Sequence, residues 1–441
     1  MTTSRRLATA HDREILRLAV PAFGALVAEP LFLLSDSAIV GHLGTAQLGG
    51  LGVAGQALST LVYLCVFLAY GTTAGVARQI GAGDTRAAIR QGIDGMWLAV
   101  AIGAVLIAVG WPLVPWTVDA FGASPVVTPY AETYLRVSLF GIPSMLVVLA
   151  GTGVLRGLQD TRTPLLVSIG GFSVNLLLNA LFVIVLEWGI AGSAWGTVLA
   201  QTGSAAVYVA VVLRAARRHG APVRPDLDGL RTSATAGFGL LVRTAALRIV
   251  LIVGTSIAAR MGDPEIAAYQ VGFQVWTLLA FALDAIAIAG QAITGRYLGA
   301  SDVTGTRAVT RRMIWWGVGC GIVFGLVILA VRPWLPGLFS SDGDVRHLLL
   351  ASLLLVAVLQ PVAGVVFVLD GILIGAGDGA YLAVTTLIAT AVFLPAAIVL
   401  YRADAGLVGL WTAIGLWMLT RMLTLGLRAR GDRWMVTGAV R

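Results

Sequence analysis

Two carboxylates stand inside the first long apolar stretch of this 441-residue chain. Glu29 and Asp36 are seven residues apart, nearly two helical turns, so both are predicted to share one helix face. A charge at membrane depth costs roughly 2.5–3.5 kcal/mol on insertion scales, so such residues are functional candidates. No arginine is predicted deep among the neighbouring helices. We therefore expect Asp36 to bind and release a proton or cation, with Glu29 either sharing that role or bonding backbone freed by Pro30.

Neutral polar residues are candidates for the walls of a pocket around Asp36. Asn175 and Asn179 stand four residues apart, which places both amides on one helix face. The other candidates lie on different predicted helices and comprise Tyr134, Thr197, Gln56 and, in the second half of the chain, Gln274. Hydrogen bonding between helices is an equally open role for all of them, because polar side chains commonly join membrane helices in this way.

The second half of the chain carries a different set of charges inside its apolar stretches. Arg243 and Arg248 are predicted to face Asp284 and Asp370 from neighbouring helices. Two positive and two negative charges can cancel, so the group is either a buried ion-pair network that holds helices together or a functional site. The residues alone leave both roles open.

Twelve apolar stretches of about 20 residues or more are long enough to cross a bilayer and must position these side chains. The sequence predicts an all-α integral membrane protein with six spans in residues 1–214, a polar cytoplasmic linker at 215–234, and six spans in 235–441. The predicted spans are 15–40, 52–77, 92–115, 131–154, 163–186, 191–214, 235–258, 266–294, 312–331, 346–374, 380–401 and 406–428.

A constant shift of 218 residues aligns the two halves without a gap. The matched pairs include polar residues that chance rarely repeats at one spacing, such as Arg78 with Arg296 and Asp84 with Asp302. With six spans per copy, the two bundles are predicted to be parallel repeats related by a pseudo-two-fold axis along the membrane normal, a plan common among secondary transporters. The copies differ in charge, since Asp36 aligns with Gly254.

Composition excludes several classes of protein. Hydrophobic residues make up 58% of the chain and charged residues 12%, which is typical of a membrane protein. All 30 basic residues are arginine, so a P-loop ATPase and a lysine Schiff base are excluded. The two cysteines and the scattered histidines have no metal-ligand spacing, and no hydrolase or metalloprotease motif is present. We expect no cofactor, no metal site and no enzyme activity.

Arginine also predicts the orientation. Of the 30 arginines, 23 fall on the side of the chain termini and 4 on the opposite side. By the positive-inside rule, both termini and the linker of this multi-pass membrane protein are expected to be cytoplasmic. The net charge of +8 then belongs to cytoplasmic loops that face the lipid, and binding to nucleic acid is not expected.

The residues also resemble a known family. The segments that carry the likeness are Leu18 to Pro21, Glu29 to Leu31, Leu34 to Gly44, Leu155 to Arg162 and Leu369 to Gly375. These segments are similar to the multidrug and toxic compound extrusion (MATE) family, and most of all to its DNA-damage-inducible, or DinF-like, branch. The resemblance covers essentially the whole chain.

The resemblance implies an antiporter of the inner (plasma) membrane that exports organic cations or other amphipathic compounds in exchange for protons, with sodium as the second candidate. It implies that Asp36 is the coupling site and that helix 1 bends near Pro21. Members of the branch carry an Asn and an Asp four apart on helix 5, whereas this chain has Asn175 and Asn179, which favours protons. A monomer is expected. The alternative is a flippase for lipid-linked precursors, which would present unpaired arginines such as Arg248 to a phosphate.

Overall fold

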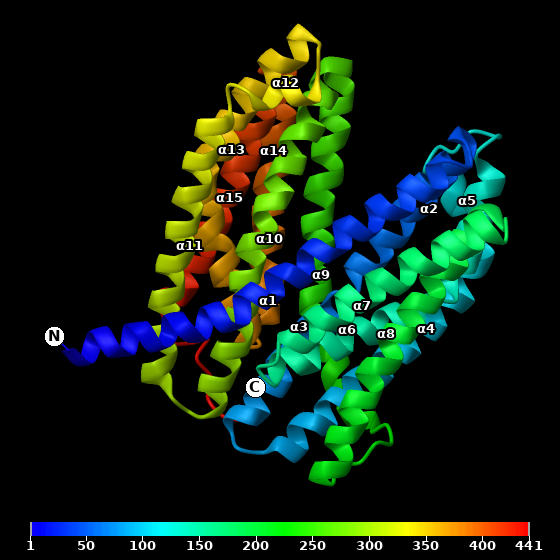
Figure 1. Ribbon diagram of the computed structural model, residues 1–441. Coiled ribbons are helices and arrows are strands. Elements are labelled where there is room, and N and C mark those ends of the chain that lie inside the picture. Colours follow the sequence, from blue (N-terminus) through cyan, green and yellow to red (C-terminus); the bar gives the residue numbers. More distant parts are fainter. Residues whose placement is uncertain (1, 440–441) are drawn as a thin grey trace. The chain divides into compact units, whose positions relative to one another are not determined.

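The computed structural model describes residues 2–439, with the side chains of 11–28 and 30–439. All long regular elements in this range are helices (Figure 1). Eleven are long and apolar enough to span a membrane. A twelfth span arises if α5 (Thr128–Leu139) and α6 (Ile142–Gly157), bent by 53° at their junction, cross together. Each span overlaps one predicted stretch, so the predicted all-α fold is confirmed.

Contacts divide the described chain into two units. We call residues 24–237 the N unit, and residues 2–23 together with 238–439 the C unit. Two helices belong partly to each unit, namely α1 (Thr2–Gly41) and α9 (Leu227–Met261). Residues 11–23 of α1, between three and four turns, therefore pack with the second half of the chain, whereas the later turns pack with the first half.

The polar segment 215–234, predicted as the linker, packs within the N unit. The last turns of one helix and the first turns of the next occupy most of it, leaving 220–226 as the connection. Arg90 and Asp226 form an ion pair at 2.5 Å. The indole of Trp97 donates to the carbonyl of Val223 at 3.0 Å. These bonds satisfy polar groups of the connection and attach it to the neighbouring helix.

The N unit has a broken-helix architecture. Its α3 and α4 pack against α6, α7 packs against α8, and α2 packs against α5. A six-residue π-helical segment, η1, follows α7 directly. Besides α5 and α6, the elements of this unit are α2 (Thr45–Leu64), α3 (Phe67–Gly81), α4 (Thr85–Ala120), α7 (Arg162–Asn179), η1 (Ala180–Val185) and α8 (Gly189–His219).

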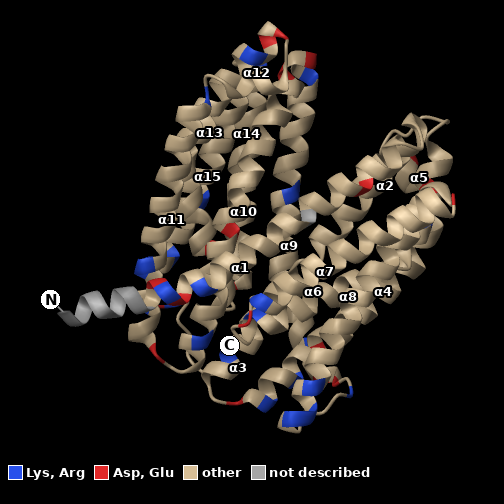
Figure 2. Cartoon of the chain, in the orientation of Figure 1, with Lys and Arg blue, Asp and Glu red and all other residues tan. Residues whose placement is uncertain are grey.

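The C unit is built around one buried helix, α13, which packs against α10, α11 and α15, while α14 packs against α15. Most charged residues of this unit gather near helix ends, and a few lie within the spans (Figure 2). Besides the shared helices, its elements are α10 (Asp263–Gly299), α11 (Val303–Val331), α12 (Leu335–Phe339), α13 (Gly343–Gly375), α14 (Gly379–Arg402) and α15 (Gly406–Arg430).

Positions related by the 218-residue shift pack in the same way in the two units. A Cβ at Gly103 would lie 2.6 Å from the Cα of Pro143, and a Cβ at Gly321 would lie 2.7 Å from the Cα of Pro361. Both glycines therefore permit the same close approach of two helices. The carboxylates of Asp84 and Asp302 cap α4 and α11 by accepting a backbone N–H three residues later, at 2.8 and 2.7 Å. Each unit therefore folds by the same local rules.

Candidate functional site

Asp36 lies in the N unit and is buried, with 2% of its surface exposed. The amide nitrogen of Asn179 donates to its Oδ1 atom. The hydroxyl of Thr197 donates to its Oδ2 atom at 3.4 Å. The carboxylate on α1 is thus positioned by side chains from α7 and α8, which pack against each other.

A second asparagine closes a ring of hydrogen bonds around this carboxylate. Asn179 also donates to Oδ1 of Asn175 at 3.1 Å, and Asn175 donates to Oγ1 of Thr197 at 3.2 Å. Both amides are fully buried. The four-residue spacing places them on one face of α7, as the sequence predicts, and that face is turned toward Asp36. Hydrogen-bond networks of this kind hold buried polar groups in defined positions.

Tyr134 of α5 completes this group. Its buried hydroxyl lies against the hydroxyls of Thr197, Ser193 and Ser138. The two serines were missed by the sequence analysis, although a signal for them exists. Ser138 follows Tyr134 by four residues and Ser193 precedes Thr197 by four, so each is one helical turn from a predicted site residue.

The backbone is irregular next to Asp36. Asn179 is the last residue of α7, and the chain continues in the π-helical η1. Single π turns inside helices are rare and are frequently found at functional sites. Gly196 of α8 packs closely against Asn179, because a Cβ at position 196 would lie 2.9 Å from Oδ1 of Asn179. The absence of a side chain at Gly196 therefore allows α8 to approach the Asn179 amide closely.

The polar contacts of Asp36 are neutral. No arginine among the described side chains forms an ion pair with it, and its recorded partners are an amide and a hydroxyl. The nearest predicted cation of the same bundle, Arg136, pairs instead with Glu132 at 2.9 Å. A buried carboxylate with neutral partners holds a proton more readily than a buried carboxylate beside an arginine does.

Other predicted site residues lie apart from this group or cannot be placed. Gln56 has an exposed side chain on α2 and makes no hydrogen bond with Asp36, so its place in the pocket stays a prediction. Gln274 is exposed on α10 of the C unit. The side chain of Glu29 lies outside the described residues. Pro21 lies within the continuous α1, two residues before its passage from one unit to the other.

The buried charges of the C unit form a triad centred on Asp370 of α13. The guanidinium groups of Arg243 (α9) and Arg421 (α15) both donate to its Oδ2 atom, the latter at 2.6 Å. All three side chains are buried. Arg421 also lies over the ring of Trp417, with 5.0 Å between Cζ and the ring centroid. One carboxylate thus joins three helices through two arginines.

The residues of this network were predicted only in part. Arg243 and Asp370 were expected in it, whereas Arg421 was not. A signal was present, because Arg421 falls inside the predicted span 406–428. Arg248 and Asp284 are half-buried and have interaction partners of their own, so Arg248 is not the free arginine that the flippase alternative requires.

Comparison with characterised proteins agrees with this architecture. The chain is 30% identical to Protein DETOXIFICATION 44, chloroplastic, of Arabidopsis thaliana, over 81% of this chain and 71% of that protein. It is 27% identical to the DNA damage-inducible protein F of Escherichia coli K12, over 83% of this chain and 81% of that protein.

Solved structures show the same fold. A structure of MATE in the bent conformation superposes with a TM-score of 0.88 at 21% identity and covers 96% of both chains. A mutant of the Vibrio cholerae MATE transporter VcmN also gives 0.88, at 20% identity, over 98% of this chain and 99% of that one. The MatE family model matches twice, at residues 21–181 and 235–399, and the two matches end 218 residues apart. The chain belongs to the MATE family of membrane transporters.

Proposed function

We propose that this protein exports organic cations or amphipathic compounds in exchange for protons, with Asp36 as the proton-binding group. The observation that carries the proposal is the burial of this carboxylate among neutral partners, with no cation of the described residues paired to it. A group that changes charge in an apolar site can bias two conformations, because it interacts differently with each.

The hydrogen bonds around Asp36 offer a local switch. In the described arrangement its two oxygens accept from Asn179 and Thr197, which suits a charged carboxylate. The Oδ1 atom of Asn179 is buried and has no hydrogen-bond partner among the described residues. When Asp36 binds a proton, one of its oxygens becomes a donor. Rotation of the Asn179 amide would then offer its unpartnered oxygen as the acceptor.

The path of α1 supports a link between this switch and access. This helix carries Asp36 in the N unit and begins in the C unit, and it changes unit two residues beyond Pro21. A proline inside a helix removes one backbone hydrogen bond and lowers the resistance to bending there. A change in the hydrogen bonds that hold α1 at Asp36 would thus be transmitted along a single helix. That helix resists bending least near Pro21, where it passes from one unit to the other.

Protons are favoured over sodium because the group contains one acid. Asn179 stands where members of the DinF-like branch have an aspartate, and an amide cannot ionise. A cationic substrate and a proton would therefore compete for the single negative charge of Asp36. The protein's relatives named for detoxification and for DNA-damage induction are consistent with export of toxic compounds.

The flippase alternative gains no support from the arginines. Asp370 binds Arg243 and Arg421, and Arg248 has a partner as well. The negative charge of Asp36 would also repel a phosphate bound beside it.

The proposal is tested by transport in reconstituted vesicles. Purified protein is placed in liposomes, and efflux of a fluorescent organic cation is driven by a proton gradient or, separately, by a sodium gradient. We expect transport with the proton gradient alone and its loss in Asp36→Asn. Asp119→Asn is the matched control, because Asp119 is exposed at the end of α4 and receives the same chemical change. Full proton-driven efflux by Asp36→Asn, or efflux driven only by sodium, would overturn the proposal.

A further inference from the structure

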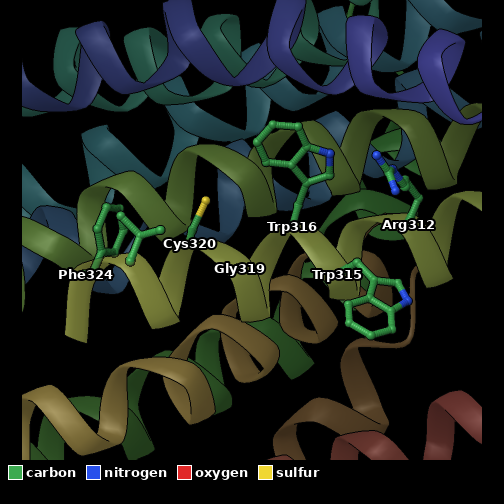
Figure 3. A pocket seen from close by; sticks show the side chains of 7 residues that line it. Arg312, Trp315, Trp316, Gly319, Cys320 and Phe324 are labelled. Carbon is green, nitrogen blue, oxygen red and sulfur yellow. The ribbon is translucent and has the colours of Figure 1, made fainter. Parts of the chain in front are cut away.

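A groove on α11 lies apart from the proposed transport site. It has a volume of about 340 Å³ and is lined by side chains at helical spacing, from Arg312 through Trp316 and Cys320 to Phe324 (Figure 3). Trp315 and Val323 complete its walls and are 66% and 55% exposed. All of these residues belong to one helix of the C unit, so the groove runs along the helix axis.

One end of the groove is fixed by an acid of the same unit. The half-buried Asp12 on α1 accepts from Nε and Nη2 of Arg312, both at 2.6 Å, and from Nε1 of Trp316 at 2.8 Å. Charge-assisted bonds of this geometry are strong and hold the guanidinium and the indole in place. Trp316 therefore forms a fixed wall, and the charges of Asp12 and Arg312 cancel each other.

The cations available at this end belong to the first turns of α11. Arg311 is exposed and forms no ion pair with the carboxylates among the described residues. It precedes Trp315 by four residues, so both lie on one face of the helix. Arg307, one turn earlier, pairs with Asp432 in an exposed bridge at 2.6 Å, which contributes little in water. The end of the groove is thus positive.

The order of residues along α11 matches a membrane interface. Arginines come first, two tryptophans follow, and residues 317–331 contain no charged side chain. Tryptophans gather at the headgroup level of bilayers, with basic residues on the aqueous side. From Arg312 to Phe324 the helix rises about 18 Å, close to the hydrocarbon depth of one leaflet at about 15 Å. The groove therefore extends from the headgroup level into a single leaflet.

We propose that this groove binds an anionic phospholipid, with its phosphate at Arg311 and one acyl chain lying over Gly319 and Cys320 toward Phe324. An anion is favoured over a transported cation because no carboxylate lines the groove, and Asp12 at its end is already bound by Arg312 and Trp316. The apolar floor fits an acyl chain, and the positive end fits the phosphate.

Photo-crosslinking of the whole protein in nanodiscs tests the assignment. Phosphatidylglycerol and phosphatidylcholine carrying the same diazirine in one acyl chain are compared as probes, and labelled peptides are identified by mass spectrometry. One arginine near a membrane surface favours an anionic lipid by about fivefold. We expect peptide 313–327 to be labelled about fivefold more by the phosphatidylglycerol probe, because that probe carries the net negative charge.

Two variants separate the charge from the groove. Arg311→Gln is expected to remove the preference for phosphatidylglycerol. Gly319→Leu is expected to lower labelling by both probes, because a Cβ at Gly319 meets nothing within 4 Å and the added side chain would fill the groove without a clash. Gly426→Leu on α15, where a Cβ also meets nothing, is the matched control and should leave the labelling unchanged.

The same experiment can overturn the proposal in three ways. Equal labelling of the peptide by the two probes would show that the charge of the lipid headgroup does not matter for binding. A preference that persists in Arg311→Gln and Gly319→Leu would place the lipid elsewhere. Displacement of the phosphatidylglycerol probe by the fluorescent cation in the unchanged protein would make the groove a substrate site.

Discussion

The N unit and the C unit share their packing rules but differ in the continuity of their helices. In the N unit one span breaks between α2 and α3, a second bends by 53° between α5 and α6, and a third ends in the π-helical η1. The spans that correspond to them by the 218-residue shift are α10, α13 and α14, and each of these is a single helix. Duplication therefore preserved the plan while the first copy acquired irregular backbone.

The same contrast holds for buried charge. In the N unit, Asp36 is held by neutral groups on elements next to two of the irregular sites. In the C unit, Asp370 is clamped by two arginines between continuous helices. A weakly held acid on irregular helices is suited to change state, whereas a clamped acid on regular helices is suited to remain fixed. On the proposed function, the N unit responds to the proton and the C unit provides a rigid frame.

The largest effect is expected from Asp370→Asn. The variant leaves two buried guanidinium groups without their counter-charge, and breaking a buried ion pair in this way costs about 3–5 kcal/mol. The midpoint of thermal unfolding in detergent should fall strongly. Asp344→Asn, an exposed position on the same helix, is the control. Adding Arg421→Gln should recover part of the loss, and an unchanged midpoint in Asp370→Asn would show that the C unit is not clamped.

Asp36→Asn should separate activity from stability. The substitution keeps the shape of the side chain and removes its charge, and burying an amide costs less than burying an unpaired carboxylate. We expect proton-driven efflux to fall to the level of protein-free liposomes, while the unfolding midpoint stays the same or rises. A large drop in the midpoint would mean that the two buried acids have the same structural role, contrary to the comparison.

Gly196→Ala should perturb the N unit without touching any charge. The new Cβ would meet Oδ1 of Asn179 at 2.9 Å, and overpacking of this kind typically costs 1–3 kcal/mol. We expect the displaced amide to reduce the initial rate of proton-driven efflux several-fold. Gly203→Ala on the same helix, where a Cβ meets nothing within 4 Å, should keep the normal rate. Equal rates for both variants would argue against a role for the Asn179 amide.

Much of this architecture could be predicted because membrane helices depend on patterns that a sequence displays directly. Uncharged stretches locate the spans, and four-residue spacing places Asn175 beside Asn179 and Tyr134 beside Ser138. The constant shift reveals the duplication. These features are local or periodic, so they require no knowledge of which helix lies next to which.

What escaped prediction depends on long-range packing. Arg421 falls inside a predicted span, but its pairing with Asp370 is visible only once α15 is placed against α13. The break at Cys65 and Val66 carries no proline or glycine to announce it, whereas the bend before α6 lies next to Gly141 and Pro143. Helix ends are similarly uncertain, since α9 starts at Leu227 within the predicted linker.

The smallest effect on stability is expected from the helix caps, which are alike in the two units. Asp84 and Asp302 cap equivalent helices through bonds of 2.8 and 2.7 Å, and loss of such a cap typically costs about 1 kcal/mol. Asp84→Ala and Asp302→Ala should therefore lower the unfolding midpoint by similar, small amounts and leave efflux intact, with Asp119→Ala as an uncapped control. Because the caps are local, equal costs would show that the units differ in their buried charges and helix continuity but not in how their helices begin. A cap that matters in one unit alone would extend the asymmetry to the helix ends, and the contrast drawn from Asp36 and Asp370 would then be only one part of a general divergence.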